Sequence, residues 1–122
     1  MTDTHIVWKA DGELPEISSP LATADHVFMV TTPGLLTCLD AKSGKMLWEH
    51  ELEEDVNASP ILVGKFVYLT DTQGITHIFE PAGMFKAVAA PSIGEAVYAT
   101  AAFVGGRIYI RGKEHLYCIA AP

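Results

Sequence analysis

Apolar residues along the chain gather in short segments that fit β-strands, and the pattern returns about every 40 residues. The segments are rich in β-branched and aromatic residues, and Gly, Pro and Asp turn signals separate them. No window shows the sustained i, i+3, i+4 apolar pattern that a helix requires. Strands are predicted over 19–24, 26–32, 35–40 and 45–52, over 59–63, 66–71, 75–80 and 84–90, and over 99–104, 107–111 and 115–120.

The repeat extends to individual residues. Trp8 returns as Trp48, and Ser19-Pro20 returns as Ser59-Pro60. Units of about 40 residues with four short strands are typical of β-propeller blades. A β-sandwich gives similar strand spacing but no residue-level repeat. The sequence therefore predicts an all-β propeller with three blade equivalents of four antiparallel strands.

The repeat starts in the middle of a unit. Residues 5–12 are predicted to form an outer strand that completes the last blade, followed by blade one over 17–53 and blade two over 57–91. Residues 98–120 supply only the inner three strands of blade three. An N-terminal strand of this kind closes a propeller by covering an open sheet edge.

Three blades do not easily close a ring, because propellers usually have about 4 to 8 blades. Two chains would give a six-bladed ring with C2 symmetry, so a homodimer is favoured. A three-blade monomer and a fragment of a larger propeller are the alternatives. The residues expected at the assembly interface are His5, Ile6, Val7 and Trp8 on one side and Leu116 and Cys118 on the other.

Composition narrows the classes of partner. Hydrophobic residues make up 49% of the 122 residues, so a core is feasible, and 15 acidic against 8 basic residues give a net charge of -7. This balance argues against nucleic acid as a partner, because phosphate binding needs clustered Lys and Arg. No apolar stretch approaches the roughly 18 residues of a membrane span. No signal-peptide pattern is visible, and the cellular compartment is not assigned from the sequence.

Cys38 and Cys118 are two periods apart, at equivalent places in different sheets. A disulfide needs α-carbons within about 7 Å. Two free, buried thiols are therefore expected, filling small apolar positions in the core.

The stretch Cys38-Leu39-Asp40-Ala41-Lys42-Ser43-Gly44-Lys45-Met46-Leu47-Trp48 resembles the tryptophan-docking motif of quinoprotein-like (PQQ-repeat) β-propellers. Trp8, Trp48, Asp40 and Gly44 are the expected docking residues. An outer-strand Trp can bury its ring against a turn and the neighbouring blade. Asp40 can accept hydrogen bonds from the amides of Ser43 and Gly44. The second unit departs from the motif, with Ala87 where the Trp is expected.

Some members of this family are PQQ-dependent dehydrogenases, which the resemblance associates with a vicinal Cys-Cys disulfide, a stacked Trp and calcium ligands. This chain has no Cys-Cys pair, and both its Trp residues stand at docking positions. No catalytic, cofactor-binding or metal-binding residues are therefore assigned, and the chain is not expected to be an enzyme. Other relatives are non-catalytic scaffolds, often extracytoplasmic.

The remaining polar residues favour a solvated surface. No two of the five histidines have metal-ligand spacing, and His77 is expected to be partly buried. Glu49, Glu51, Glu53, Glu54 and Asp55 suggest an acidic rim. The predicted function is a non-catalytic module for scaffolding or protein binding that self-assembles by exchange of its N-terminal strand. The alternatives are an inactive fragment of a PQQ-dependent dehydrogenase or other propeller enzyme, and a binder of small ligands in the channel.

Overall fold

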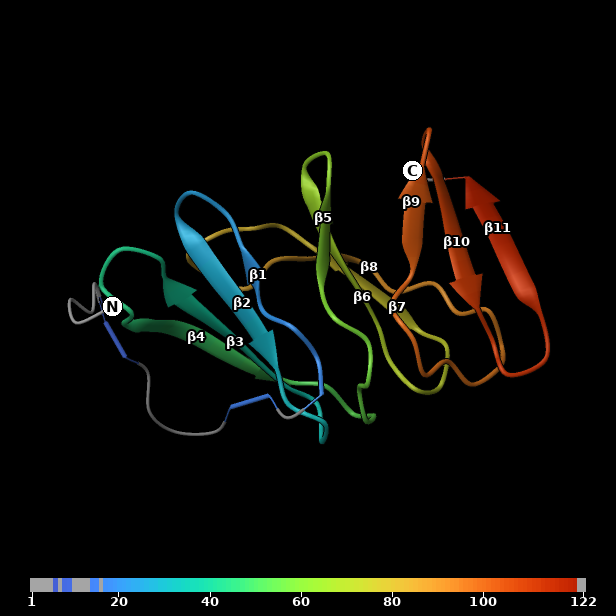
Figure 1. Cartoon of the computed structure of the whole chain (residues 1–122), viewed down its shortest axis with the longest axis horizontal. Coiled ribbons are helices and arrows are strands. Elements are labelled where there is room, and N and C mark those ends of the chain that lie inside the picture. The colour runs from blue at the N-terminus through green and yellow to red at the C-terminus, as the bar shows by residue number, and fades with distance from the viewer. Residues whose placement is uncertain (1–5, 7, 10–13, 16, 121–122) are drawn as a thin grey trace, which may run out of the picture.

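The predicted strand segments form three antiparallel sheets, which lie side by side with the first and third at opposite ends (Figure 1). The computed structural model describes residues 6, 8, 9, 14, 15 and 17–120, and these residues form no helix. Within them no helix could therefore cross a membrane. The prediction of an all-β propeller fold is confirmed.

The strands of each sheet follow one another in sequence order, so each sheet is a meander of hairpins. The first sheet contains β1 (Leu21–Ala22), β2 (His26–Val30), β3 (Leu35–Asp40) and β4 (Met46–Glu51). The second contains β5 (Ile61–Val63), β6 (Phe66–Thr70), β7 (Thr76–Phe79) and β8 (Ala87–Ala89). The third contains β9 (Ala102–Val104), β10 (Arg107–Arg111) and β11 (Leu116–Ala120).

Apolar side chains pack between neighbouring sheets in two cores. The first core, between the first two sheets, is built around Phe28, Leu36, Val67, Leu69 and Phe79, with Trp48 packed against it. The second core, between the second and third sheets, is built around Tyr68, Ile78, Val97, Ile108 and Ile110. Burying one face of each sheet on the next is the expected way for repeat units to gain stability.

One expectation about the cysteines is wrong. Both are free, as predicted, and Cys38 is buried on β3, but Cys118 on β11 is exposed. The cause is position in the sheet. Cys38 has β2 on one side and β4 on the other, whereas β11 pairs only with β10 among the described residues.

The predicted outer strand over 5–12 falls mostly outside the described residues. His5 and Val7 of the predicted interface are among those not described, whereas Ile6 and Trp8 are described. The pairing of this segment with β11 stays a prediction.

Candidate functional site

Trp8 docks onto the turn between β3 and β4. Its indole Nε1 donates a hydrogen bond to the carbonyl of Ala41 over 2.8 Å. Gly44 in the same turn has φ of 76°, and a Cβ added there would lie 2.5 Å from the Trp8 ring. Gly44 is therefore needed for two reasons, the left-handed backbone and the space for the indole.

Trp48 on β4 makes the same contact one repeat later. Its Nε1 donates to the carbonyl of Ala82, in the turn between β7 and β8, over 2.9 Å. The ring also packs between the sheets, with its centroid 6.0 Å from those of Phe28 and Phe79 and 5.3 Å from that of Phe85. Each docking Trp thus ties its own segment of the chain to the turn of the following blade.

Asp40 shapes the turn that receives Trp8. Its Oδ2 accepts hydrogen bonds from the Ser43 amide over 2.9 Å and from the Ser43 hydroxyl over 2.7 Å. The hydroxyl contact is the main cause that lowers the pKa of Asp40 below its ordinary value, and the amide contact adds to it. The Gly44 amide was expected to donate to the carboxylate of Asp40. It donates instead to the backbone carbonyl of that residue.

The position that lacks a docking Trp in the second sheet is Ala89. Trp48 stands opposite Cys38 in the strand register, and Ala89 stands opposite Ile78, the residue one repeat after Cys38. The motif comparison pointed to Ala87, and it was wrong because the connection between β7 and β8, from Phe79 to its partner Ala87, is one residue longer than the connection from Leu39 to Met46.

The predicted interface residues on β11 lie on an edge strand that pairs with no other described strand besides β10. Leu116 is 69% exposed, and Cys118 is also exposed. On the N-terminal side Ile6 is 57% exposed. Trp8 lies against the first sheet, and β11 lies at the far end of the third (Figure 1). The structure therefore does not bring Trp8 and Cys118 of one chain together.

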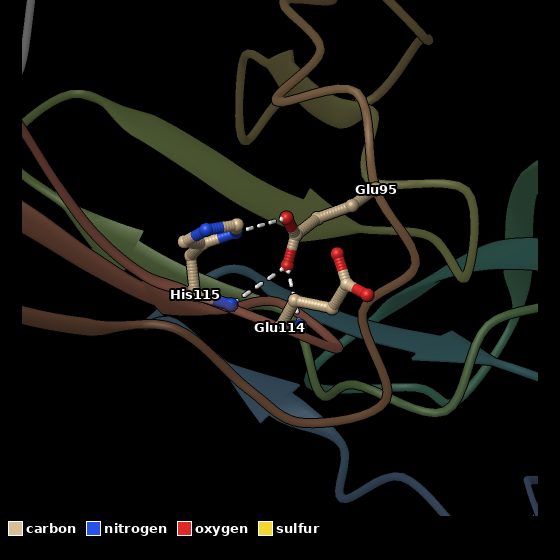
Figure 2. A group of neighbouring side chains, drawn as sticks. All are labelled: Glu95, Glu114 and His115. Carbon is tan, nitrogen blue, oxygen red and sulfur yellow. Dashed lines mark hydrogen bonds and ion pairs between the residues drawn. The ribbon is translucent and has the colours of Figure 1, made fainter.

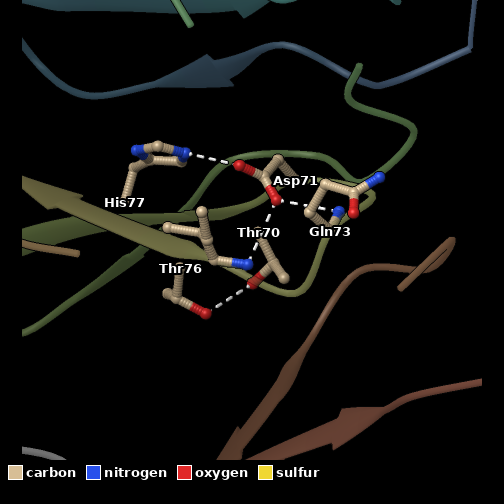
Figure 3. Close-up of polar contacts among 6 residues, drawn as sticks. Thr70, Asp71, Gln73, Thr76 and His77 are labelled. Atoms are coloured by element: carbon tan, nitrogen blue, oxygen red, sulfur yellow. Dashed lines mark hydrogen bonds and ion pairs between the residues drawn. The ribbon is translucent and has the colours of Figure 1, made fainter. Parts of the chain in front are cut away.

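A buried carboxylate in the second sheet forms a compact polar cluster (Figure 3). Asp71 is 1% exposed, and its Oδ1 accepts hydrogen bonds from the amides of Gln73 and Ile75 at 3.0 and 3.1 Å. Its Oδ2 lies 2.8 Å from Nε2 of His77, which is half-buried as the sequence suggested. These contacts fix the turn between β6 and β7.

A second carboxylate cluster lies between the second and third sheets (Figure 2). Glu95 reaches from the loop after β8 to the turn between β10 and β11, where its Oε1 accepts the amides of Glu114 and His115 at 2.8 and 3.0 Å. Its Oε2 accepts the Tyr117 hydroxyl and lies 2.9 Å from Nδ1 of His115. The Tyr117 hydrogen bond and then the His115 contact lower the pKa of Glu95 to about 2, and the same bond raises the pKa of Tyr117.

Glu95, Glu114 and His115 are also the set of possible metal ligands whose donor atoms lie within 4.8 Å of one another. Both oxygens of Glu95 already accept hydrogen bonds from the protein, so this carboxylate serves as a turn cap. The sequence analysis missed this residue. The available signal was Gly112, which stands where the earlier repeats carry the polar side chains of Thr31 and Asp71.

Comparison with solved structures supports the propeller architecture. BamB from Moraxella catarrhalis superimposes with a TM-score of 0.79 at 18% identity, covering 93% of this chain and 36% of that one. Quinohemoprotein alcohol dehydrogenase ADHIIG from Pseudomonas putida HK5 gives 0.66 at 14%, covering 93% and 20%. The computationally designed Ika4 protein gives 0.64 at 9%, covering 98% of this chain and 100% of that one. At these identities the likeness shows the fold alone.

The chain thus spans about a third of the length of the BamB structure. No curated protein sequence matches it. A family profile does match, over residues 2–82, and this range includes both docking Trp residues and the residues whose carbonyls accept their hydrogen bonds, Ala41 and Ala82. On this evidence the chain belongs to the PQQ-repeat propeller family described as outer membrane protein assembly factor BamB.

Proposed function

We propose that this chain is a non-catalytic β-propeller module that binds or scaffolds other proteins and completes its own ring by exchanging its N-terminal strand with a second copy. The observation that carries the proposal is the equivalence of Trp8 and Trp48. Both indoles donate to a carbonyl in the turn of the following blade, Ala41 for Trp8 and Ala82 for Trp48. Since Trp48 belongs to the outer strand of its sheet, Trp8 stands where the outer strand of a preceding sheet would run.

The third sheet offers the complementary edge. In blade one Trp48 pairs with Cys38 and Met46 pairs with Leu39. Shifting these pairs by whole repeats places Trp8 opposite Cys118 and Ile6 opposite Ile119. Both Ile6 and Ile119 are exposed, at 57% and 38%. Pairing them would cover apolar surface and an open strand edge, which proteins generally avoid leaving free.

The positions of the two ends support the involvement of a second copy. Trp8 lies on the first sheet and β11 at the other end of the row of sheets, so one chain does not join its own ends (Figure 1). Two copies joined head to tail would form a closed, symmetric six-bladed ring, the size range in which propellers pack normally.

The biological role proposed for the ring is protein binding in the assembly of outer membrane proteins. The support is the family description, which names an outer membrane protein assembly factor. The alternative is an inactive piece of a PQQ-dependent dehydrogenase. Its support is the structural likeness to the alcohol dehydrogenase. Addition of PQQ and calcium separates them, because a dehydrogenase piece would produce a cofactor-dependent absorbance and a scaffold would not.

Light scattering after size exclusion tests the assembly. The expected mass is about 26 kDa, twice the 13.2 kDa of one chain. Deletion of residues 1–9 should give a monomer or a precipitate, because the edge of β11 then has no cover. A mass of 13.2 kDa at every concentration, or an unchanged mass after the deletion, would contradict strand exchange.

Cross-linking tests the register in a Cys118→Ser background. Ile6→Cys with Ile119→Cys should form a disulfide between chains, because directly opposed residues meet the distance requirement of a disulfide. The matched control pairs Ile6→Cys with Val104→Cys, which is 68% exposed on the other edge strand of the same sheet. Equal cross-linking in both variants would show random collision instead of a defined pairing.

A further inference from the structure

We propose that the apolar cavity between the second and third sheets binds a small, planar aromatic molecule about the size of indole. The cavity has a volume of about 400 Å³. Ile78, Ile108 and Ile110 form its buried floor, and Ala89, Ile119 and Ala120 form its exposed rim. Apolar cavities of about 150 Å³ already bind benzene, and ligand sites commonly range from roughly 300 to 1,000 Å³.

The repeat itself indicates which occupant fits. At the equivalent place between the first two sheets, the indole of Trp48 packs against Phe79, and the strand register assigns Ala89 to the position of Trp48. The same register assigns Ile119 to the position of Phe79. Ile119 pairs with Ile108 in the third sheet, as Phe79 pairs with Val67 in the second. Two large aromatic side chains are thus replaced by Ala and Ile, and the space of an indole is left between the sheets.

The entry route favours a free molecule over an aromatic side chain of another protein. In the first sheet the backbone that carries the indole is β4. In the second sheet β8 occupies that place and presents Ala89. A ring attached to a foreign peptide would have to bring its own backbone to a position that β8 already fills, whereas a free ring enters past the exposed rim. All lining residues belong to one chain. In the proposed ring, Ile6 of the second copy would lie opposite Ile119 and would add to the rim.

Equilibrium dialysis and calorimetry with indole as the probe test the site on the full chain. Saturable binding of about one indole per chain is expected. Ala89→Trp fills the cavity with a tethered ring and should weaken indole binding by about tenfold or more. Ala87→Trp is the matched control, because it adds the same side chain to the same strand at a position that does not line the cavity, and it should leave binding unchanged.

A gain-of-site variant makes the test stricter. Trp48→Ala should open a second cavity of the same kind and raise the stoichiometry to about two indoles per chain. If Ala89→Trp does not fold, Ala89→Leu fills part of the space and should weaken binding several-fold. The proposal is overturned if the chain binds no indole up to millimolar concentration. It is also overturned if the Ala89 variants bind as the unaltered chain does, or if N-acetyltryptophanamide binds as tightly as indole.

Discussion

The carboxylate of Glu95 occupies the space that a side chain at Gly112 would fill. The first two sheets cap the equivalent turn with a residue of the turn itself. Thr31 Oγ1 accepts the Leu35 amide over 3.1 Å, and Asp71 performs the same task in the second sheet. In the third sheet the turn has Gly112 at this position, and the cap comes from the preceding blade. Glu95 thereby links the second and third sheets through polar contacts, where the docking Trp is missing.

We expect Gly112→Ala to destabilise the chain by about 1 to 3 kcal/mol, because the added methyl group overpacks a filled space. Gly112 has no positive φ, so the effect is steric and not a backbone effect. Urea unfolding measures it. Gly83→Ala is the control, since its Cβ would meet its nearest neighbour, the His26 ring, only at 3.9 Å. Adding Glu95→Ala to Gly112→Ala should restore part of the lost free energy of unfolding, because the overlapping carboxylate is gone. Strictly additive effects of the two substitutions would contradict the overlap.

Glu95 should make stability depend on pH in acid. Its pKa in the folded protein is about 2, below the ordinary 4.5, because Tyr117, His115 and the Glu114 amide favour the ionised form. The stabilising contribution is therefore complete above about pH 4.5 and is lost as the pH falls toward 2. Melting temperatures between pH 2 and 7 should show that unaltered protein and Glu95→Gln differ above pH 5 and converge in acid. Glu51→Gln, on the exposed face of β4, should show no such convergence.

Replacing Asp71 by Ala should lower the free energy of unfolding more than replacing it by Thr. Asp71→Ala leaves the partly buried amides of Gln73 and Ile75 without their acceptor and should cost about 3 kcal/mol. Asp71→Thr imitates Thr31, restores one acceptor and should cost about 1 to 2 kcal/mol. Denaturant titrations of both variants give the comparison. Equal losses would mean that the His77 contact, which neither variant keeps, is the main contribution of this carboxylate.

The two thiols should differ sharply in reactivity. Burial, and then the charge of Asp40, raises the pKa of Cys38 to about 11, so its reactive thiolate is scarce near neutral pH. At pH 8 iodoacetamide should modify exposed Cys118 in the native protein and Cys38 only after unfolding, as mass spectrometry can show. In the proposed ring Cys118 faces Trp8 of the second copy, so its modification should slow as protein concentration rises. Rapid modification of native Cys38 would contradict the packing described here.

The sequence was a good guide to features that recur locally. The 40-residue period predicted the strands of all three sheets, because β-branched runs and turn residues act over a few positions. It also predicted the docking motif, and Gly44 has the positive φ expected of its turn. It failed where the connection between β7 and β8 is longer than that between β3 and β4, so the position of the missing Trp is Ala89 and not Ala87. It also failed at Glu95, whose partners lie 19 to 22 residues away.

The sequence by itself determined the repeat and the strand order within each sheet, since these follow from local propensity and periodicity, and its docking motif indicated the family by resemblance. Tertiary structure decided how neighbouring sheets meet. It buried Cys38 and exposed Cys118, although both stand at the same place in the repeat. It also left a cavity on one side of the second sheet and a packed indole on the other. The physical reason is that burial depends on what covers a residue from the next strand or sheet, which no residue specifies alone.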